Sequence, residues 1–143
     1  MSQQEENKTN SPKPFPNDNP HVWKSLKPYM NEYTKVGYII FHVYYENDAG
    51  EKIPIENAQI VIAKEIYDSY FFSKCVRTNH LGITNPIVLP TLCTDASDVR
   101  KGNQSCVYSA IIKAPNMKRQ DIHDIPVFDG VTSTKSIQMI QKK

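Results

Sequence analysis

Apolar side chains alternate with other residues along much of the chain after residue 37, which is the pattern of β-strands that bury one face. In residues 38–45, Ile39, Phe41, Val43 and Tyr45 fall on one side of the predicted strand. Further short apolar or alternating runs predict strands over residues 58–62, 71–78, 87–89, 107–113, 122–128 and 136–141. The pattern therefore predicts about seven strands and no amphipathic helix after residue 36.

Turn signals separate these runs. Residues 47–50 (NDAG) and 79–82 (NHLG) are rich in Asn, Asp and Gly, which favour turns. Short strands divided by turns favour a sandwich over a βαβ fold. We therefore expect an all-β protein, with a single antiparallel β-sandwich over residues 37–143. Residues 90–105 form the one long predicted loop, of a length more often functional or mobile than incidental.

The amino-terminal part has a different composition. Residues 1–20 hold four prolines among polar residues and too few apolar side chains to offset the entropy of ordering, so we expect a disordered leader. Residues 21–36 carry an apolar stripe, but Pro28 interrupts any continuous helix there. This segment is predicted to be a short helical or irregular linker.

The length and the charge of the chain limit the functions that we expect. The 143 residues suffice for one ordinary domain, and the net charge of +2 arises from acidic and basic residues spread along the chain. Nucleic-acid binding usually leaves a clustered basic footprint, so we expect no nucleic-acid partner. The sequence shows neither a membrane span nor the layout of a signal peptide, so we expect a protein that stays inside the cell.

The three cysteines, Cys75, Cys93 and Cys106, contain no CxxC pair. Their odd number fits a reducing compartment, so free thiols are the favoured interpretation. Oxidation of Cys93 and Cys106 would close one loop, and the sequence leaves that alternative open.

The sequence shows no catalytic, cofactor or metal motif, and we predict no such residues. His21, His42, His80 and His123 lack HxxxH or HExxH spacing. Asp121, Asp124 and Asp129 are interpreted as solvated turn residues. A nucleophilic cysteine beside His80 or His123 stays open without a supporting motif.

Two segments resemble carboxypeptidase-regulatory-like, or transthyretin-like, domains. Residues 53–62 (IPIENAQIVI) are similar to the P-I-x-x-A-x-V-x-I opening of those domains, and residues 78–84 (TNHLGIT) occupy the place of their T-D-x-x-G-x-T segment. The likeness is closest to the amino-terminal domain of clostridial spore cortex-lytic enzyme precursors, through residues 86–90, 108–112 and 122–139. It departs from them at Asn79 and at residues 114–116. The resemblance implies a sandwich of the prealbumin or immunoglobulin-like kind and an association with the spore or with cell-wall machinery. Together with the missing signal-peptide layout, it leads us to expect a cytoplasmic or spore-associated location.

The predicted function follows from the missing motifs and from this resemblance. We expect a non-catalytic binding or structural accessory module that acts through protein contacts. A peptidoglycan- or carbohydrate-binding module is the first alternative, because aromatic rings stack on sugars, and an unrecognised hydrolase is the second. The candidate partner-binding residues are Trp23, Tyr29, Tyr33, Asp95, Asp98 and Arg100.

Overall fold

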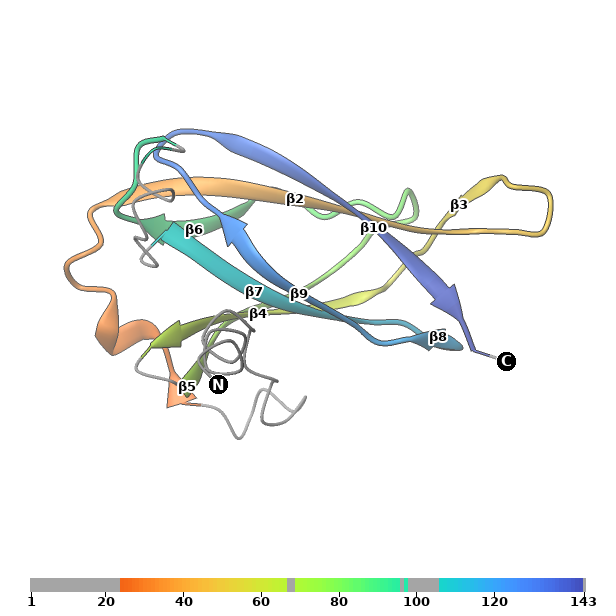
Figure 1. Cartoon of the computed structure of the whole chain (residues 1–143), viewed down its shortest axis with the longest axis horizontal. Coiled ribbons are helices and arrows are strands. Elements are labelled where there is room, and N and C mark those ends of the chain that lie inside the picture. Colours follow the sequence, from red (N-terminus) through yellow and green to blue (C-terminus); the bar gives the residue numbers. More distant parts are fainter. Residues whose placement is uncertain (1–23, 67–68, 96, 98–105, 143) are drawn as a thin grey trace, which may run out of the picture.

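The computed structural model describes residues 24–66, 69–95, 97 and 106–142, and this part is all-β, as predicted. Figure 1 shows the strands as two layers, with β2 and β10 in one and β4, β5 and β7 in the other. The elements are β1 (Lys24–Ser25), the 3₁₀ turn η2 (Lys27–Tyr29), β2 (Lys35–Glu46), β3 (Lys52–Pro54), β4 (Gln59–Ile66), β5 (Ser69–Arg77), β6 (Ile87–Thr91), β7 (Val107–Lys113), β8 (Met117–Lys118), β9 (Gln120–Pro126) and β10 (Thr132–Gln141).

The first sheet has the strand order β1-β5-β4-β7-β9, and the second sheet has the order β3-β2-β10-β8, with β6 also paired to β2. Both sheets are mixed. The expected purely antiparallel sandwich is therefore corrected, because β10 runs parallel to β2 and β1 runs parallel to β5. The chain passes from β9 in the first sheet to β10 in the second, so no hairpin imposes antiparallel pairing on β10 and β2.

The core lies between the two sheets and follows the period-two pattern of the sequence. On β2, Ile39, Phe41 and Val43 are fully buried, as the alternation predicts. They meet Ile60 and Ile62 of β4 in one hydrophobic cluster. The extra strands beyond the predicted set are the short β1, β3 and β8, whose two or three residues are too few to show a periodicity.

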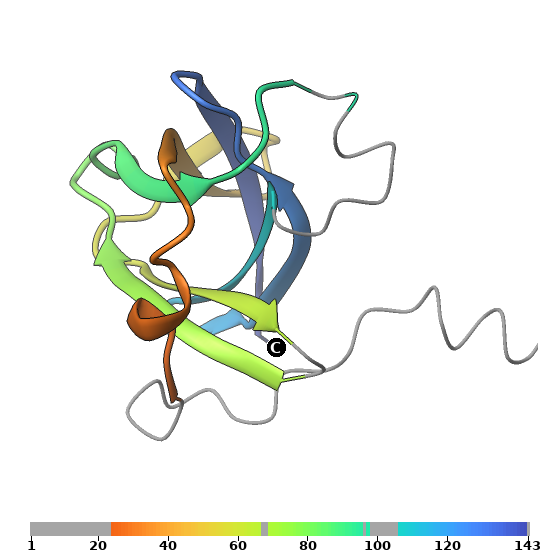
Figure 2. The same ribbon diagram turned by 90° about the vertical axis from the view of Figure 1, so that its left-hand side faces the viewer.

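The segment before β2 closes one end of the sandwich. Figure 2 shows it crossing that end from the first sheet to the second. Pro28 lies in the 3₁₀ turn η2, which agrees with the prediction of a short turn in place of a continuous helix. Leu26 is buried in the core, so this linker packs on the domain. The predicted disordered leader of residues 1–20 lies outside the described residues.

Gly37 marks a close approach of two segments. A Cβ atom at this position would overlap the carbonyl oxygen of Phe128 and would lie 2.7 Å from Cγ1 of Val127. The adjoining backbone is fixed by the Gly130 amide, which donates to the Val36 carbonyl oxygen at 2.8 Å. Glycine is therefore required where β2 passes the segment that leads into β10.

A disulfide joins Cys93 and Cys106, whose Cα atoms are 5.5 Å apart, within the normal range for this bond. Both side chains are fully buried, while Cys75 is free and exposed. The favoured interpretation of three free thiols is therefore wrong for two of them. Spacing along the sequence did not decide the pairing, because the contact depends on β6 and β7 bringing the ends of the long loop together.

Candidate functional site

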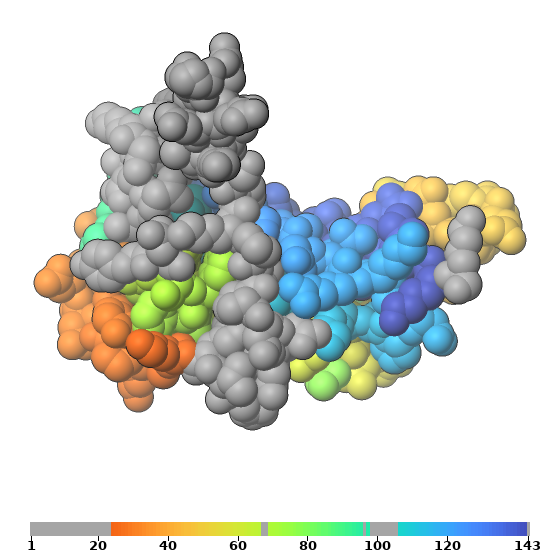
Figure 3. Space-filling view, turned by 60° about the horizontal axis from the view of Figure 1, so that its bottom comes forward, coloured from red at the N-terminus to blue at the C-terminus, as the bar shows by residue number. Residues whose placement is uncertain are grey.

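The outer face of the first sheet carries a second apolar cluster, separate from the core. Val61, Ala63 and Ile111 are its fully buried members, and Phe72 packs against them. These residues alternate along β4 and β7 with the core residues of the same strands. Figure 3 shows the side of the molecule where β4 and β5, in green, lie beside β7 and β9, in blue.

A β-bulge on β9 places a histidine beside this cluster. Tyr108 pairs with Ile125 and Ala110 pairs with Ile122, so two residues, His123 and Asp124, stand opposite Ser109. Asp124 has a φ of +59°, a left-handed conformation that Asp tolerates better than most residues. Bulges of this kind re-aim side chains, and here the half-buried His123 reaches Ser109.

Three side chains from three strands meet at one nitrogen. The hydroxyl of Tyr70 on β5 lies 3.4 Å from Nδ1 of His123, and the hydroxyl of Ser109 on β7 lies 3.3 Å from the same atom. When the imidazole carries its proton on Nε2, Nδ1 accepts a hydrogen bond from either hydroxyl. Tyr70 and Ser109 are each 7 % exposed, so the cluster is largely shielded from water. We call these three residues the Tyr70–Ser109–His123 cluster.

The surroundings keep the phenol of Tyr70 protonated. Burial, followed by the negative charges of Glu65, Asp124 and Asp121, raises the pKa of Tyr70 to about 12, and a hydrogen bond from Ser109 works against the rise. A phenol with this pKa remains a hydrogen-bond donor throughout the physiological range. The cluster therefore combines a hydroxyl nucleophile, a base and a neutral donor within hydrogen-bond reach of one another.

Tyr29, Tyr33 and Asp95 are the candidate partner-binding residues that the structure describes. They contact residues outside this cluster. Tyr29 is exposed and packs edge-to-face on Phe71, with ring centroids 4.8 Å apart. The ring of Tyr33 lies 5.8 Å from Nζ of Lys64. Asp95 accepts hydrogen bonds from the backbone and hydroxyl of Ser97. Trp23, Asp98 and Arg100 lie outside the described residues.

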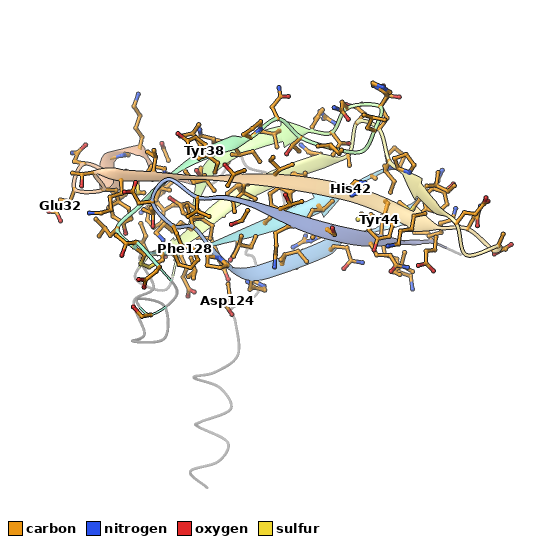
Figure 4. All side chains as sticks on the ribbon, turned by 90° about the horizontal axis from the view of Figure 1, so that it is seen from above. Glu32, Tyr38, His42, Tyr44, Asp124 and Phe128 are labelled. Atoms are coloured by element: carbon orange, nitrogen blue, oxygen red, sulfur yellow. A yellow bond between two sulfur atoms is a disulfide. The ribbon has the colours of Figure 1, made fainter. Side chains whose placement is uncertain are left out.

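The outer face of the second sheet carries a row of rings. Tyr38, His42 and Tyr44 follow β2, as Figure 4 shows, and Asp124 lies apart from them on the side where β9 runs. The rings of His42 and Tyr44 are 5.8 Å apart, and Nζ of Lys52 lies 5.2 Å from the Tyr44 centroid. His42 therefore lies on the outer face of the second sheet.

Sequence reasoning did not find the cluster. As a catalytic base, His123 was considered only beside a cysteine. Cys93 and Cys106 form a disulfide, and the structure brings His123 to Ser109 instead. The available signal was a polar Ser109 inside the apolar run 107–112, on the face opposite the core residues. Among the described residues no three His, Cys, Asp or Glu side chains gather as a metal site would require. No helix in the described part of the chain is long and apolar enough to cross a membrane.

Comparisons with known proteins give structural matches only. No protein-family model matches the chain, and no curated protein matches it. Among solved structures it is similar to 3-chlorocatechol 1,2-dioxygenase from Rhodococcus opacus 1CP, with 10 % identity and a TM-score of 0.45 over 92 % of this chain and 70 % of that one. Catechol 1,2-dioxygenase from Acinetobacter radioresistens matches with 11 % identity and a TM-score of 0.42 over 80 % and 56 %. For chlorocatechol 1,2-dioxygenase from Pseudomonas putida the values are 9 %, 0.38, 92 % and 64 %.

These matches bear on one prediction from the sequence. All three structures are enzymes, and this finding contradicts the prediction of a non-catalytic accessory module. A sandwich can carry catalysis as well as binding. At these identities and TM-scores, no reaction, substrate or residue role is transferred from the dioxygenases to this chain.

Proposed function

We propose that the chain is a hydrolase that cleaves a carboxylic ester or amide, with Ser109 as the nucleophile and His123 as the general base. The observation that carries the proposal is the 3.3 Å distance between Oγ of Ser109 and Nδ1 of His123. A serine hydroxyl becomes an effective nucleophile when a base within hydrogen-bond reach takes its proton. The burial of Ser109 supports the same role, because a water-poor site strengthens electrostatic interactions.

The proposed reaction uses these three side chains and water. Oγ of Ser109 bonds to the carbonyl carbon as its proton passes to Nδ1 of His123, and Tyr70 donates a hydrogen bond to the resulting oxyanion. When the scissile bond breaks, the leaving group takes the proton from His123 and the acyl group remains on Ser109. Water then attacks the acyl-serine, His123 accepts a proton from that water, and the proton returns to Ser109 as the acid leaves.

The experiment is hydrolysis of p-nitrophenyl acetate and butyrate by the full chain, with Ser109→Ala, His123→Ala and Tyr70→Phe as variants. We expect Ser109→Ala and His123→Ala each to lower kcat/KM about 100-fold or more. Tyr70→Phe should lower it about 10-fold or more if its hydroxyl stabilises the oxyanion. A fluorophosphonate probe should add its mass to the peptide that contains Ser109.

Ser136→Ala is the matched control, because Ser136 is an exposed serine on β10 of the second sheet. It should leave the rate and the labelling unchanged. Hydrolysis that survives Ser109→Ala, or probe mass found on another residue, would contradict the proposed nucleophile. Thermal unfolding of each variant separates a loss of chemistry from a loss of fold.

Two expectations from the sequence remain proposals. Kinship with carboxypeptidase-regulatory-like domains is supported by residues 53–62 and 78–84. A spore-associated location is supported by that resemblance, whereas the Cys93–Cys106 disulfide is more typical of an oxidising compartment than of the cytoplasm. Fractionation of the producing cells, with an antibody to the chain, tests the location directly.

A further inference from the structure

Two carboxylates flank the Tyr70–Ser109–His123 cluster. Glu65 is the cross-strand partner of Tyr70 in the register of β4 and β5, so their side chains project from the same face. Asp124 follows His123 directly in the bulge of β9. Both charges act on Tyr70, whose phenol they help to keep protonated. The electrostatic field at the cluster is therefore negative on two sides.

Two described cations close in sequence to these carboxylates are engaged by other groups. Arg119 is engaged by Asp121, with Nε donating to one carboxylate oxygen at 2.7 Å and Nη2 to the other at 3.1 Å. Lys64 lies in the same strand as Glu65 but is buried, with its Nζ on the carbonyl oxygen of Val107. No ion pair joins Glu65 or Asp124 to a cation within the described ranges.

The apolar residues beside the cluster are fully buried, except for Phe72. Val61, Ala63 and Ile111 lie next to Tyr70, with Phe72 at their border. A substrate that reaches Ser109 would meet the partly buried Phe72 and the two exposed carboxylates. An anionic group, such as a phosphate or a free carboxylate, would be repelled there.

From this arrangement we infer that the site selects esters or amides that carry a positive charge near the scissile bond. The inference rests on the proposed hydrolase function, because it assigns the substrate class of that same site. Glu65 and Asp124 act here as specificity residues. In water, the attraction between two opposite charges about 6 Å apart corresponds to about a three-fold change in rate or affinity. The attraction is stronger where water is excluded.

The experiment compares three p-nitrophenyl esters with acyl groups of similar size. One carries a trimethylammoniobutyryl group, the second has carbon in place of the ammonium nitrogen, and the third ends in a carboxylate. We expect kcat/KM for the cationic ester to exceed that for its neutral isostere about ten-fold, with the anionic ester slowest. Added salt at about 1 M should shrink the difference, because it screens exposed charges.

Glu65→Gln and Asp124→Asn should each reduce the ratio of kcat/KM between the cationic and the neutral ester about three-fold. Asparagine suits the left-handed backbone at position 124, so the fold is preserved. Asp48→Asn, in the exposed turn after β2, is the matched control and should leave the preference intact. Equal, Ser109-dependent rates for all three esters would overturn the charge preference alone. Absence of any Ser109-dependent hydrolysis would overturn the proposed function and this inference with it.

Discussion

Nζ of Lys64 lies 4.6 Å from the centroid of the Tyr108 ring, although the Lys64 side chain is only 1 % exposed. Lys64 follows Ile60 and Ile62 onto the inner face of β4, where its amine donates to the carbonyl oxygen of Val107 at 2.9 Å. The two-residue period of the strand therefore places the ammonium group of Lys64 in the core. These contacts only partly replace the water that this cation loses.

Stability should depend on pH through this lysine. Burial lowers the pKa of Lys64 from 10.5 to about 8 in the folded state. Between these values the unfolded chain holds a proton that the folded chain has lost, so the free energy of unfolding should rise with pH from about 8 to 10.5. The full rise is about 3 kcal/mol from Lys64 alone. Urea unfolding at a series of pH values measures it.

Lys64→Met tests whether Lys64 is the source. The methionine keeps an unbranched apolar stem and removes the cost of burying a charge, so we expect it to stabilise the protein at pH 7 by about 1–3 kcal/mol. Its stability should also lose the rise between pH 8 and 10.5. Lys74→Met, an exposed lysine on β5, is the control and should retain the rise. An identical pH profile for Lys64→Met and the unaltered chain would refute this account.

The Cys93–Cys106 disulfide should contribute measurably to stability. It closes a loop with a sequence separation of 13, and in the chain-entropy model a loop of that size is worth about 3 kcal/mol. The double variant Cys93→Ala/Cys106→Ala should lose about this amount in chemical denaturation. Cys75→Ala, at the exposed thiol, should change stability by less than about 0.5 kcal/mol. If dithiothreitol leaves the stability of the unaltered chain unchanged, the bond is not formed in solution.

Gly37→Ala should be strongly destabilising. The new Cβ would overlap the Phe128 carbonyl oxygen, so β2 or the segment before β10 must shift, at a cost of about 2–4 kcal/mol. Gly50→Ala is the control. This variant also replaces a glycine, which has a φ of +82°, but no atom lies within 4 Å of the new Cβ. Only the cost of placing alanine in this backbone conformation, about 1 kcal/mol, is therefore expected. Equal losses of stability in the two variants would rule out the close contact as the cause.

The alternation of apolar residues was enough to predict the main strands and the sandwich, because one face of each strand must be buried. Ile39, Phe41 and Val43 are buried as their spacing required. The parallel pairing of β2 with β10 was not predictable in this way, since alternation specifies which face is buried but not which strand lies beside it.

The candidate site could not be predicted from the sequence for a related reason. Tyr70, Ser109 and His123 come from three strands, and they meet only because β5, β4, β7 and β9 lie in that order in one sheet. His123 reaches Ser109 through a bulge whose extra residue, Asp124, adopts a left-handed backbone. Neither strand order nor bulge position is encoded in local spacing, whereas the polar residue on an apolar strand was visible from the start.

The titration of Tyr70 should report on the whole cluster. Its pKa of about 12 results mainly from burial, with added repulsion from nearby carboxylates and an opposing hydrogen bond from Ser109. Ser109→Ala removes the bond that favours the phenolate, so the pKa of Tyr70 should rise further. Glu65→Gln removes a negative charge beside the phenol, so the pKa should fall toward its ordinary value. Carbon NMR of labelled tyrosine rings, assigned with Tyr70→Phe, measures both shifts.

Lys52→Met, beside Tyr44 on the second sheet, is the control and should leave the Tyr70 titration unchanged. Shifts of the same sign in Ser109→Ala and Glu65→Gln would mean that Ser109 does not stabilise the phenolate of Tyr70.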